Sequence, residues 1–323
     1  MTEDELIAEV FRPLATGPGA DDLGDDAATI APDRRELVVT CDALAAGVHF
    51  VADDPPEAIA AKALRVNLSD LAAKGAEPFG YVLALALAPG WTVDWARRFA
   101  DGLAADQSRY GIALLGGDTL RASPGGGTMI TITAFGHAER IVRRRTASPG
   151  DIIIVTGTIG DAALGLKCHL GEAMPALSTS SKAALIKAYL RPTPPVACWR
   201  AVAAHASASM DISDGLLTDL AKLTRTADVS AAIDLAKVPF SPAVQDAIGL
   251  APPLRDLALT GGDDYQILAT VPPTKADAYI ASCAALGTNA VAIGKVSAGP
   301  PAVRTFERGV ETTITSGRFN HFG

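Results

Sequence analysis

Basic residues and cysteines are scarce in this chain of 323 residues. Lys and Arg total 28 against 36 Asp and Glu, which gives a formal net charge of −8. Binding to nucleic acid requires a basic surface, so this balance argues against a nucleic-acid partner. The four cysteines lie far apart without a C-x-x-C pair, and the five histidines include no H-x-x-x-H. Neither a disulfide framework nor a zinc site is therefore predicted.

Long apolar runs are also lacking, although 49% of the residues are hydrophobic. The longest run, residues 81–91, is broken by Pro89 and Gly90 and falls well short of the roughly 18 residues that span a bilayer. The acidic start has Thr2 and Glu5 at the spacing of a capping box, which predicts a short helix and not a signal peptide. We therefore expect a cytoplasmic protein with no membrane partner.

The common nucleotide-binding and hydrolase motifs are absent. The sequence has no G-x-x-x-x-G-K-[ST] loop, no kinase glycine loop with its lysine and no dinucleotide fingerprint. Ser-His-Asp hydrolysis stays open, but no G-x-S-x-G elbow is present. A bound nucleotide would have to be held largely through divalent metals, with help from a few cations such as Arg144.

Strand and helix signals alternate along both halves of the chain, which predicts an α/β (α+β) fold of two domains. A change of character at residues 143–151 places the boundary after residue 146, giving domains 1–146 and 147–323. Expected strands lie at 27–31, 37–42, 79–88, 112–115, 128–135, 152–156, 231–235, 266–271 and 290–296, with a brief one within 208–215. Expected helices lie at 57–75, 91–110, 178–190, 194–206, 216–226 and 274–286, and a further helix is expected after the segment 157–161.

Three details of the first domain follow from local composition. Residues 79–88 are apolar throughout, which predicts a strand buried on both faces. Gly116 and Gly117 predict a turn that ends the strand at 112–115. The glycine-rich stretch 123–127 predicts a hairpin connection, with 128–135 as the returning strand.

The long helix carries the first candidate site residue. Asn67, Asp70 and Lys74 are three and four positions apart and share one helical face. Apolar neighbours leave Asp70 partly buried, where a carboxylate needs a cation or hydrogen-bond donors. An ion pair with Lys74 and a role in metal binding both stay open.

Aspartates recur at strand ends, turns and helix starts, beside glycine, serine and threonine. They are Asp25, Asp26, Asp42, Asp70, Asp118, Asp211, Asp214, Asp263 and Asp264. Any one of them could be a helix cap or turn former. Gathered on one rim without counter-charges, they would repel unless divalent cations lay among them. Such oxygen ligands favour Mg²⁺, Mn²⁺ or Ca²⁺, and the pattern as a whole favours a metal–phosphate site.

At this point the sequence resembles a known family, the thiamine-monophosphate kinases of the AIR-synthetase-like (PurM-like) superfamily, over nearly its whole length. Gly-Gly-Asp and Asp-Ile-Ser-Asp-Gly-Leu mark the superfamily, whereas His49-Phe50 and Asn67 to Ala73 point to this family. The segments that carry the resemblance are 24–28, 40–42, 47–50, 66–78, 116–119, 210–216 and 261–265.

The resemblance implies a fold, an activity and an assembly. The fold would be a two-domain PurM-like one whose N-terminal sheet pairs across a homodimer axis. The activity would be direct transfer of the ATP γ-phosphoryl group to thiamine monophosphate, without a phospho-enzyme. Several Mg²⁺ ions would neutralise the two anionic substrates. The acceptor phosphate is already a nucleophile, so no strong base is needed.

The resemblance also assigns roles to residues. Metal ligands would be Asp26, Thr40, Cys41 (through its backbone carbonyl), Asp42, Asp70, Asp118, Asp211 and Asp214, with Asp42, Asp70 and Asp118 central to catalysis. Tyr110, Gly117, Asp118, Arg144 and Ser213 would contact ATP, and His49, Asp263 and Phe319 would contact thiamine monophosphate. Asp263 stands where the family usually has glutamate, and Phe319 where it has tyrosine or tryptophan.

Two kinds of alternative stay open. One is another ATP-using PurM-like enzyme, such as selenophosphate synthetase, a hydrogenase-maturation protein or AIR synthetase. The other is a nucleotide- or metal-binding regulator without catalytic activity. Magnesium-dependent ATP turnover separates these classes.

Overall fold

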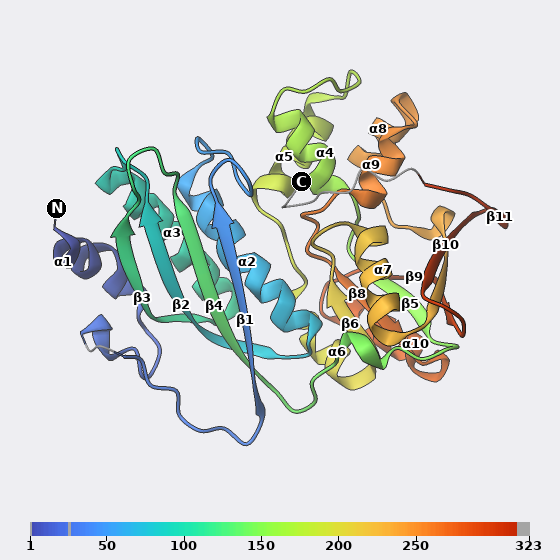
Figure 1. Cartoon of the computed structure of the whole chain (residues 1–323), viewed down its shortest axis with the longest axis horizontal. Coiled ribbons are helices and arrows are strands. Elements are labelled where there is room, and N and C mark those ends of the chain that lie inside the picture. Colours follow the sequence, from blue (N-terminus) through green and yellow to red (C-terminus); the bar gives the residue numbers. More distant parts are fainter. Residues whose placement is uncertain (1, 25–26, 315–323) are drawn as a thin grey trace. The chain divides into compact units, whose positions relative to one another are not determined.

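The computed structural model describes residues 2–24 and 27–314, and the chain divides into two compact units (Figure 1). The first comprises Met1–Leu71 and Ala76–Glu139, and the second comprises Ala72–Gly75 and Arg140–Gly323. Asp25, Asp26 and Phe319 lie outside the described residues. Within the described ranges, no helix is long and apolar enough to cross a membrane.

Short helices open the first unit. Helix α1 (Glu3–Leu6) begins with the predicted capping box, in which Thr2 and Glu5 each bond the other's backbone N–H. Helix α1 leads into the helical turns Ile7–Phe11, Arg12–Leu14 and Asp21–Leu23. The strand predicted at 27–31 is wrong, because these residues form no strand pairing. Ala27 and Ala28 instead line a pocket that is described below with the candidate site.

Four strands form the sheet of the first unit, in the order β1-β4-β2-β3. Their bounds are β1 (Glu36–Ala45), β2 (Glu77–Leu87), β3 (Ala113–Arg121) and β4 (Met129–Ala138). Strand β2 is parallel to β3, whereas β4 is antiparallel to both β1 and β2. The predicted hairpin is wrong, because β4 does not pair with β3 but enters the middle of the sheet.

Helices α2 (Pro56–Ala73) and α3 (Val93–Tyr110) cover one face of this sheet (Figure 1). Leu83, Leu85 and Ile132 point to that face and are almost fully buried. The other face is open within the first unit, where Val39 is 53% and Met129 51% exposed. The prediction that residues 79–88 are buried on both faces is therefore wrong, because helices cover this sheet on one side only.

The glycine pair of the first unit lies inside a strand. Gly116 and Gly117 continue β3 alongside β2, so the predicted turn is wrong. A Cβ atom on Gly117 would lie 2.0 Å from the carbonyl oxygen of Leu83. Glycine is needed here because the two strand backbones approach too closely for any side chain.

The second unit contains a seven-stranded sheet in the order β11-β10-β7-β9-β5-β8-β6. Its strands are β5 (Ile152–Thr156), β6 (Ala208–Asp211), β7 (Ser230–Asp234), β8 (Ile267–Val271), β9 (Ala290–Ser297), β10 (Ala302–Glu307) and β11 (Val310–Glu311). The predicted strands of this half are confirmed to within one or two residues. Strands β10 and β11 were not predicted, since only half of their residues are apolar and these form no continuous run.

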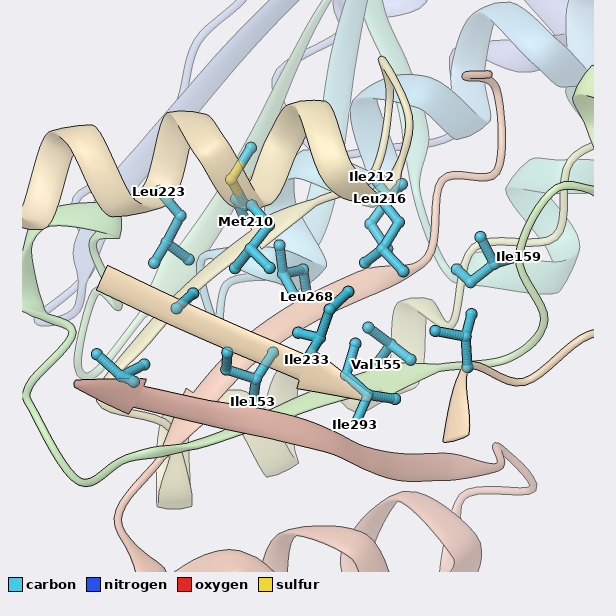
Figure 2. Close-up of a cluster of buried hydrophobic side chains, with 14 of the residues drawn as sticks. Ile153, Val155, Ile159, Met210, Ile212, Leu216, Leu223, Ile233, Leu268 and Ile293 are labelled. Atoms are coloured by element: carbon cyan, nitrogen blue, oxygen red, sulfur yellow. The ribbon is translucent and has the colours of Figure 1, made fainter. Parts of the chain in front are cut away.

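Helices cover both faces of this second sheet. Helix α7 (Leu216–Ala227) lies on one face, and α6 (Trp199–His205) and α10 (Ala276–Ala285) lie on the other. Helices α4 (Asp161–His169), α5 (Thr179–Leu190), α8 (Pro242–Leu250) and α9 (Leu254–Thr260) pack mainly against one another in a separate apolar cluster. Figure 2 shows Leu216 and Leu223 of α7 lying over Ile153, Val155 and Leu268 of the sheet. Ile154, between Ile153 and Val155, packs on the other side with α6 and α10. The continuous apolar run of β5 follows from this burial on both faces.

Candidate active site

Strand β1 and helix α2 bring three predicted metal ligands together, namely Thr40, Asp42 and Asp70. Thr40 and Asp42 alternate with Cys41 along β1, so they share the helix-covered face. The Thr40 Oγ1 donates a hydrogen bond to Asp70 Oδ2 at 2.5 Å. Burial and the nearby charge of Asp70 raise the pKa of Asp42 to about 6. The two carboxylates thus lie close enough for the charge of Asp70 to act on Asp42.

Cys41 lies on the opposite, open face of the sheet and is exposed. Its thiol therefore points away from the face that Asp42 shares with α2. A contribution from Cys41 to a metal on the Asp42 side would have to come from its backbone carbonyl oxygen, as the resemblance implies.

The loop after β1 holds His49 in a defined protonation pattern. Its Nδ1 accepts a hydrogen bond from the backbone N–H of Ala45 at 3.0 Å, so in the neutral ring the proton is on Nε2. The buried Lys62 donates to the carbonyl oxygen of His49 at 2.9 Å and fixes the loop to α2. Lys62 was not predicted as part of the site. His49 can thereby present an N–H donor, as recognition of an anionic substrate requires.

Asp118 lies on β3 at the edge of a pocket of about 270 Å³. The pocket is lined by apolar side chains, among them Phe11, Leu23 and Ala28, and by the strand segment Leu114–Thr119. Apolar walls beside glycine backbone and one carboxylate suit a ligand with a flat apolar part and a phosphate end. The pocket belongs entirely to the first unit.

Asp118 and Asp42 do not meet within the first unit. Across the sheet, Asp42 is opposite Ile132, which is opposite Leu83, which pairs with Gly117. Asp42 and Asp118 are therefore three strand spacings apart, about 14 Å, and belong to opposite faces of the sheet. Among the residues that the structure describes, no three His, Cys, Asp or Glu side chains are grouped to hold a metal ion.

Tyr110 ends helix α3 beside a buried ion pair. Arg65 forms two hydrogen bonds of 2.7 Å with the Asp106 carboxylate, and its guanidinium lies 5.8 Å from the Tyr110 ring. The buried Tyr110 hydroxyl has no hydrogen-bond partner among the described residues. Burial raises the pKa of this phenol. Arg65 and Asp106 are 41 positions apart, so no sequence pattern pairs them, and sequence reasoning missed both.

In the second unit, Asp211 is the last residue of β6, and the loop that follows it carries Ser213 and Asp214 before α7 begins. The backbone N–H groups of Ser213 and Asp214 donate to Asp219 Oδ2 at 2.9 and 2.8 Å. Lys222 pairs with Asp214 and with the fully buried Asp219. The expectation that the aspartates lack counter-charges is therefore wrong for Asp214. Only the immediate sequence neighbours were considered, and Lys222 lies further along the chain, in α7.

A second loop, Gly261–Tyr265, lies against the first. The backbone N–H of Asp263 donates to the Ser213 carbonyl oxygen at 2.9 Å, so Asp263 and Ser213 are neighbours. Asp264 points inward instead, and both of its carboxylate oxygens accept the Gly160 N–H at the start of α4. Asp264 is therefore a helix cap and not a candidate ligand. Arg144 is half-buried in the short helical turn Arg144–Thr146.

Comparison with known proteins gives the same picture from both sequence and structure. The family described as AIR synthase related protein matches with its N-terminal domain over residues 24–138 and with its C-terminal domain over 148–305. A thiamine-monophosphate kinase of Caulobacter vibrioides is 41% identical, covering 97% of this chain and 88% of that protein.

Solved structures agree with this. The crystal structure of thiamine-monophosphate kinase from Stenotrophomonas maltophilia superposes with a TM-score of 0.80 at 37% identity, covering 90% of each chain. AaThiL complexed with AMPPCP and TMP superposes with a TM-score of 0.79 at 31% identity, covering 93% of this chain and 91% of that one. The predicted family and the predicted two-domain fold are confirmed.

Proposed function

This chain belongs to the thiamine-monophosphate kinase family, and on that premise we propose that it transfers the γ-phosphoryl group of ATP to the phosphate of thiamine monophosphate, giving thiamine diphosphate and ADP. It is a phosphotransferase with a phosphate group as acceptor. The observation that carries the proposal is the pair formed by Asp42 and Asp70, two neighbouring carboxylates with a raised pKa at Asp42.

These two carboxylates fit Mg²⁺. The cation prefers carboxylate oxygens and completes its coordination with substrate phosphates and water, so two or three protein ligands suffice. A bound Mg²⁺ would supply the positive charge that two anionic substrates need in order to approach each other. Thr40, hydrogen-bonded to Asp70, holds that carboxylate in place so that the pair keeps its spacing.

The remaining chemistry is positioning. The acceptor phosphate oxygen attacks the γ-phosphorus in line, and no side chain has to remove a proton from it. The pocket beside Asp118 would hold the nucleotide, with the glycine backbone of β3 close to its phosphates. The Nε2–H of His49 would bond the anionic acceptor.

The separation of Asp42 and Asp118 supports a homodimer. Strands β1 and β3 are the two edges of the described four-stranded sheet, and each carries one of these aspartates. A second copy that places its β3 edge beside β1 would bring the strand that carries Asp118 in one chain next to the strand that carries Asp42 in the other. We propose that each active site is shared between two copies in this way.

The other residue roles stay predictions. They are Asp26, Asp211 and Asp214 at the metals, Tyr110, Gly117, Arg144 and Ser213 at ATP, and Asp263 and Phe319 at thiamine monophosphate. The assignment of nucleotide binding and dimerisation to residues 1–146 stays a prediction as well.

Product formation tests the proposed function directly. Purified protein with ATP and Mg²⁺ is incubated with thiamine monophosphate or, as a control acceptor, free thiamine, and products are separated by chromatography. We expect thiamine diphosphate from the monophosphate alone. ATP turnover without thiamine diphosphate would point to another PurM-like enzyme. No turnover with either Mg²⁺ or Mn²⁺ would favour a binding regulator.

A further inference from the structure

Two strained residues flank the buried Asp264 in the loop Gly261–Tyr265. Asp263 has φ +71° and Tyr265 has φ +50°, both in the left-handed region. A bulky side chain such as that of Tyr265 is rarely found there, because its Cβ crowds the backbone. Such strain persists only where the surrounding structure imposes it, and it tends to cluster at functional sites.

The loop is held from one side by the backbone of the Ser213 loop. The backbone N–H groups of Asp263 and Tyr265 donate to the carbonyl oxygens of Ser213 and Ile212, at 2.9 and 2.8 Å. A Cβ atom on Gly262 would lie 2.1 Å from the Ser213 carbonyl oxygen, so the two backbones are in direct contact. The position of Asp263 is thus tied to that of Ser213.

Asp264 anchors the loop from the other side. Only 6% of this residue is exposed, and its carboxylate oxygens lie 3.0 and 2.8 Å from the Gly160 backbone nitrogen. A carboxylate at the start of a helix is favoured by the helix dipole and the unpaired N–H groups. With Asp264 turned inward, the neighbouring Asp263 carboxylate is directed out of the core, where it is only half-buried.

The side chain of Tyr265 then reaches back to Asp263. Its hydroxyl donates a hydrogen bond to Asp263 Oδ1 at 3.0 Å, two residues away. This bond restricts rotation of the carboxylate. The restriction matters because aspartate is one methylene shorter than glutamate, so a substrate contact from Asp263 depends on the exact placement of its backbone and rotamer.

We propose that Tyr265 is a positioning residue for the acceptor substrate. Its strained backbone places its hydroxyl where it holds the Asp263 carboxylate in the orientation that binds thiamine monophosphate. This rests on the proposed function, which assigns the acceptor to Asp263. The contact is to the substrate through Asp263, so Tyr265 affects acceptor binding and leaves ATP binding and the chemical step unchanged.

Tyr265→Phe tests this, because it removes the hydroxyl and keeps the ring. We expect KM and the calorimetric Kd for thiamine monophosphate to rise about tenfold, the loss typical of a hydrogen bond to a charged group. We expect kcat, KM for ATP and Tm to change little. Tyr279→Phe, a hydroxyl deletion on α10 in the same unit, is the matched control and should leave both constants for thiamine monophosphate unchanged.

A double-mutant cycle shows whether Tyr265 acts through Asp263. In an Asp263→Ala background, Tyr265→Phe should have no further effect on either constant. The proposal would be overturned if Tyr265→Phe alone left KM and Kd for thiamine monophosphate unchanged. It would also be overturned if Tyr265→Phe raised these constants equally in the Asp263→Ala background, or if Tm and kcat fell in parallel with acceptor binding. If the wild type forms no thiamine diphosphate yet binds thiamine monophosphate about tenfold more tightly than Tyr265→Phe, the proposed activity fails and this inference stands. If the wild type does not bind it at all, both fail.

Discussion

The aspartates of the two units differ in how their charge is balanced. In the first unit, Asp42 and Asp70 lie close together, and burial and the charge of Asp70 raise the pKa of Asp42. In the second unit, Lys222 pairs with Asp214 and Asp219, and backbone N–H groups pair with Asp219 and Asp264. Burial raises the pKa of Asp219 and Asp264 as well, so the two sets differ in their partners and not in the direction of the pKa shift. In the proposed function, a divalent cation that binds with the substrates balances the charge of the first set.

The largest expected effect comes from removing charge in the first unit. Asp42→Asn keeps the shape of the side chain but takes away one carboxylate from the proposed Mg²⁺ site. We expect thiamine diphosphate formation to fall by at least about 10³-fold, as for loss of a group that stabilises transition-state charge. Asp277→Asn, at an exposed position of α10, is the matched control and should retain full activity. Full activity of Asp42→Asn would remove Asp42 from the site.

A mixing experiment tests whether the site is shared between copies. Asp42→Asn and Asp118→Asn, each inactive alone, are denatured together at equal amounts and refolded. If each site combines Asp42 of one chain with Asp118 of the other, half of the dimers are mixed and each has one intact site. About a quarter of wild-type activity should return. Activity that stays at the level of the separate variants would place both residues in one chain's site.

The second unit should respond in stability more than in chemistry. Lys222→Met keeps the length of the side chain but leaves Asp219, which is fully buried, without its cation. Loss of one partner of a buried ion pair lowers the free energy of unfolding by about 3 kcal/mol. We expect a somewhat smaller loss here because Lys222 is partly exposed. The free energy of unfolding in urea measures this change, with Lys275→Met as an exposed control. A change below about 0.5 kcal/mol would show that the pair is not needed for folding.

The smallest effect concerns pH. The pKa of Asp42 is raised to about 6, so the metal-free folded state binds this proton more tightly than the unfolded chain does. Stability is therefore lost as the pH rises from about 4 to about 6, by at most about 3 kcal/mol. In metal-free buffer, the Tm of Asp42→Asn should exceed that of the wild type near pH 8, and this difference in Tm should narrow toward about pH 5. A difference in Tm that does not change with pH would mean that ionised Asp42 does not destabilise the folded state.

Much of the fold follows from local sequence signals. An Ala- and Leu-rich run that ends at Gly75 predicts α2, the helical spacing of apolar residues predicts α3, and apolar runs predict β1, β5 and β8. These features depend on residues near one another in sequence. The order of the strands does not, so the entry of β4 between β1 and β2 was missed. The open face of β2 was missed too, because an apolar run does not show whether helices pack on one face of the sheet or on both.

The candidate site divides in the same way. Gly-Gly-Asp, the aspartate after β6 and the Asn67–Ala73 helix can be recognised as motifs. The ion pairs Arg65–Asp106 and Asp214–Lys222 cannot, because each joins residues that only the fold brings together. The roles of Asp264 and Tyr265 depend on backbone conformation, which composition does not specify.

Mg²⁺ binding to the first unit's carboxylates tests the central claim most directly. Thermal unfolding of the wild type, Asp42→Asn and Asp277→Asn is followed near pH 8 as Mg²⁺ is added to metal-free protein. We predict that Mg²⁺ raises the Tm of the wild type and of Asp277→Asn and leaves that of Asp42→Asn nearly unchanged. An equal rise in all three proteins would contradict the account, because the cation would then bind elsewhere.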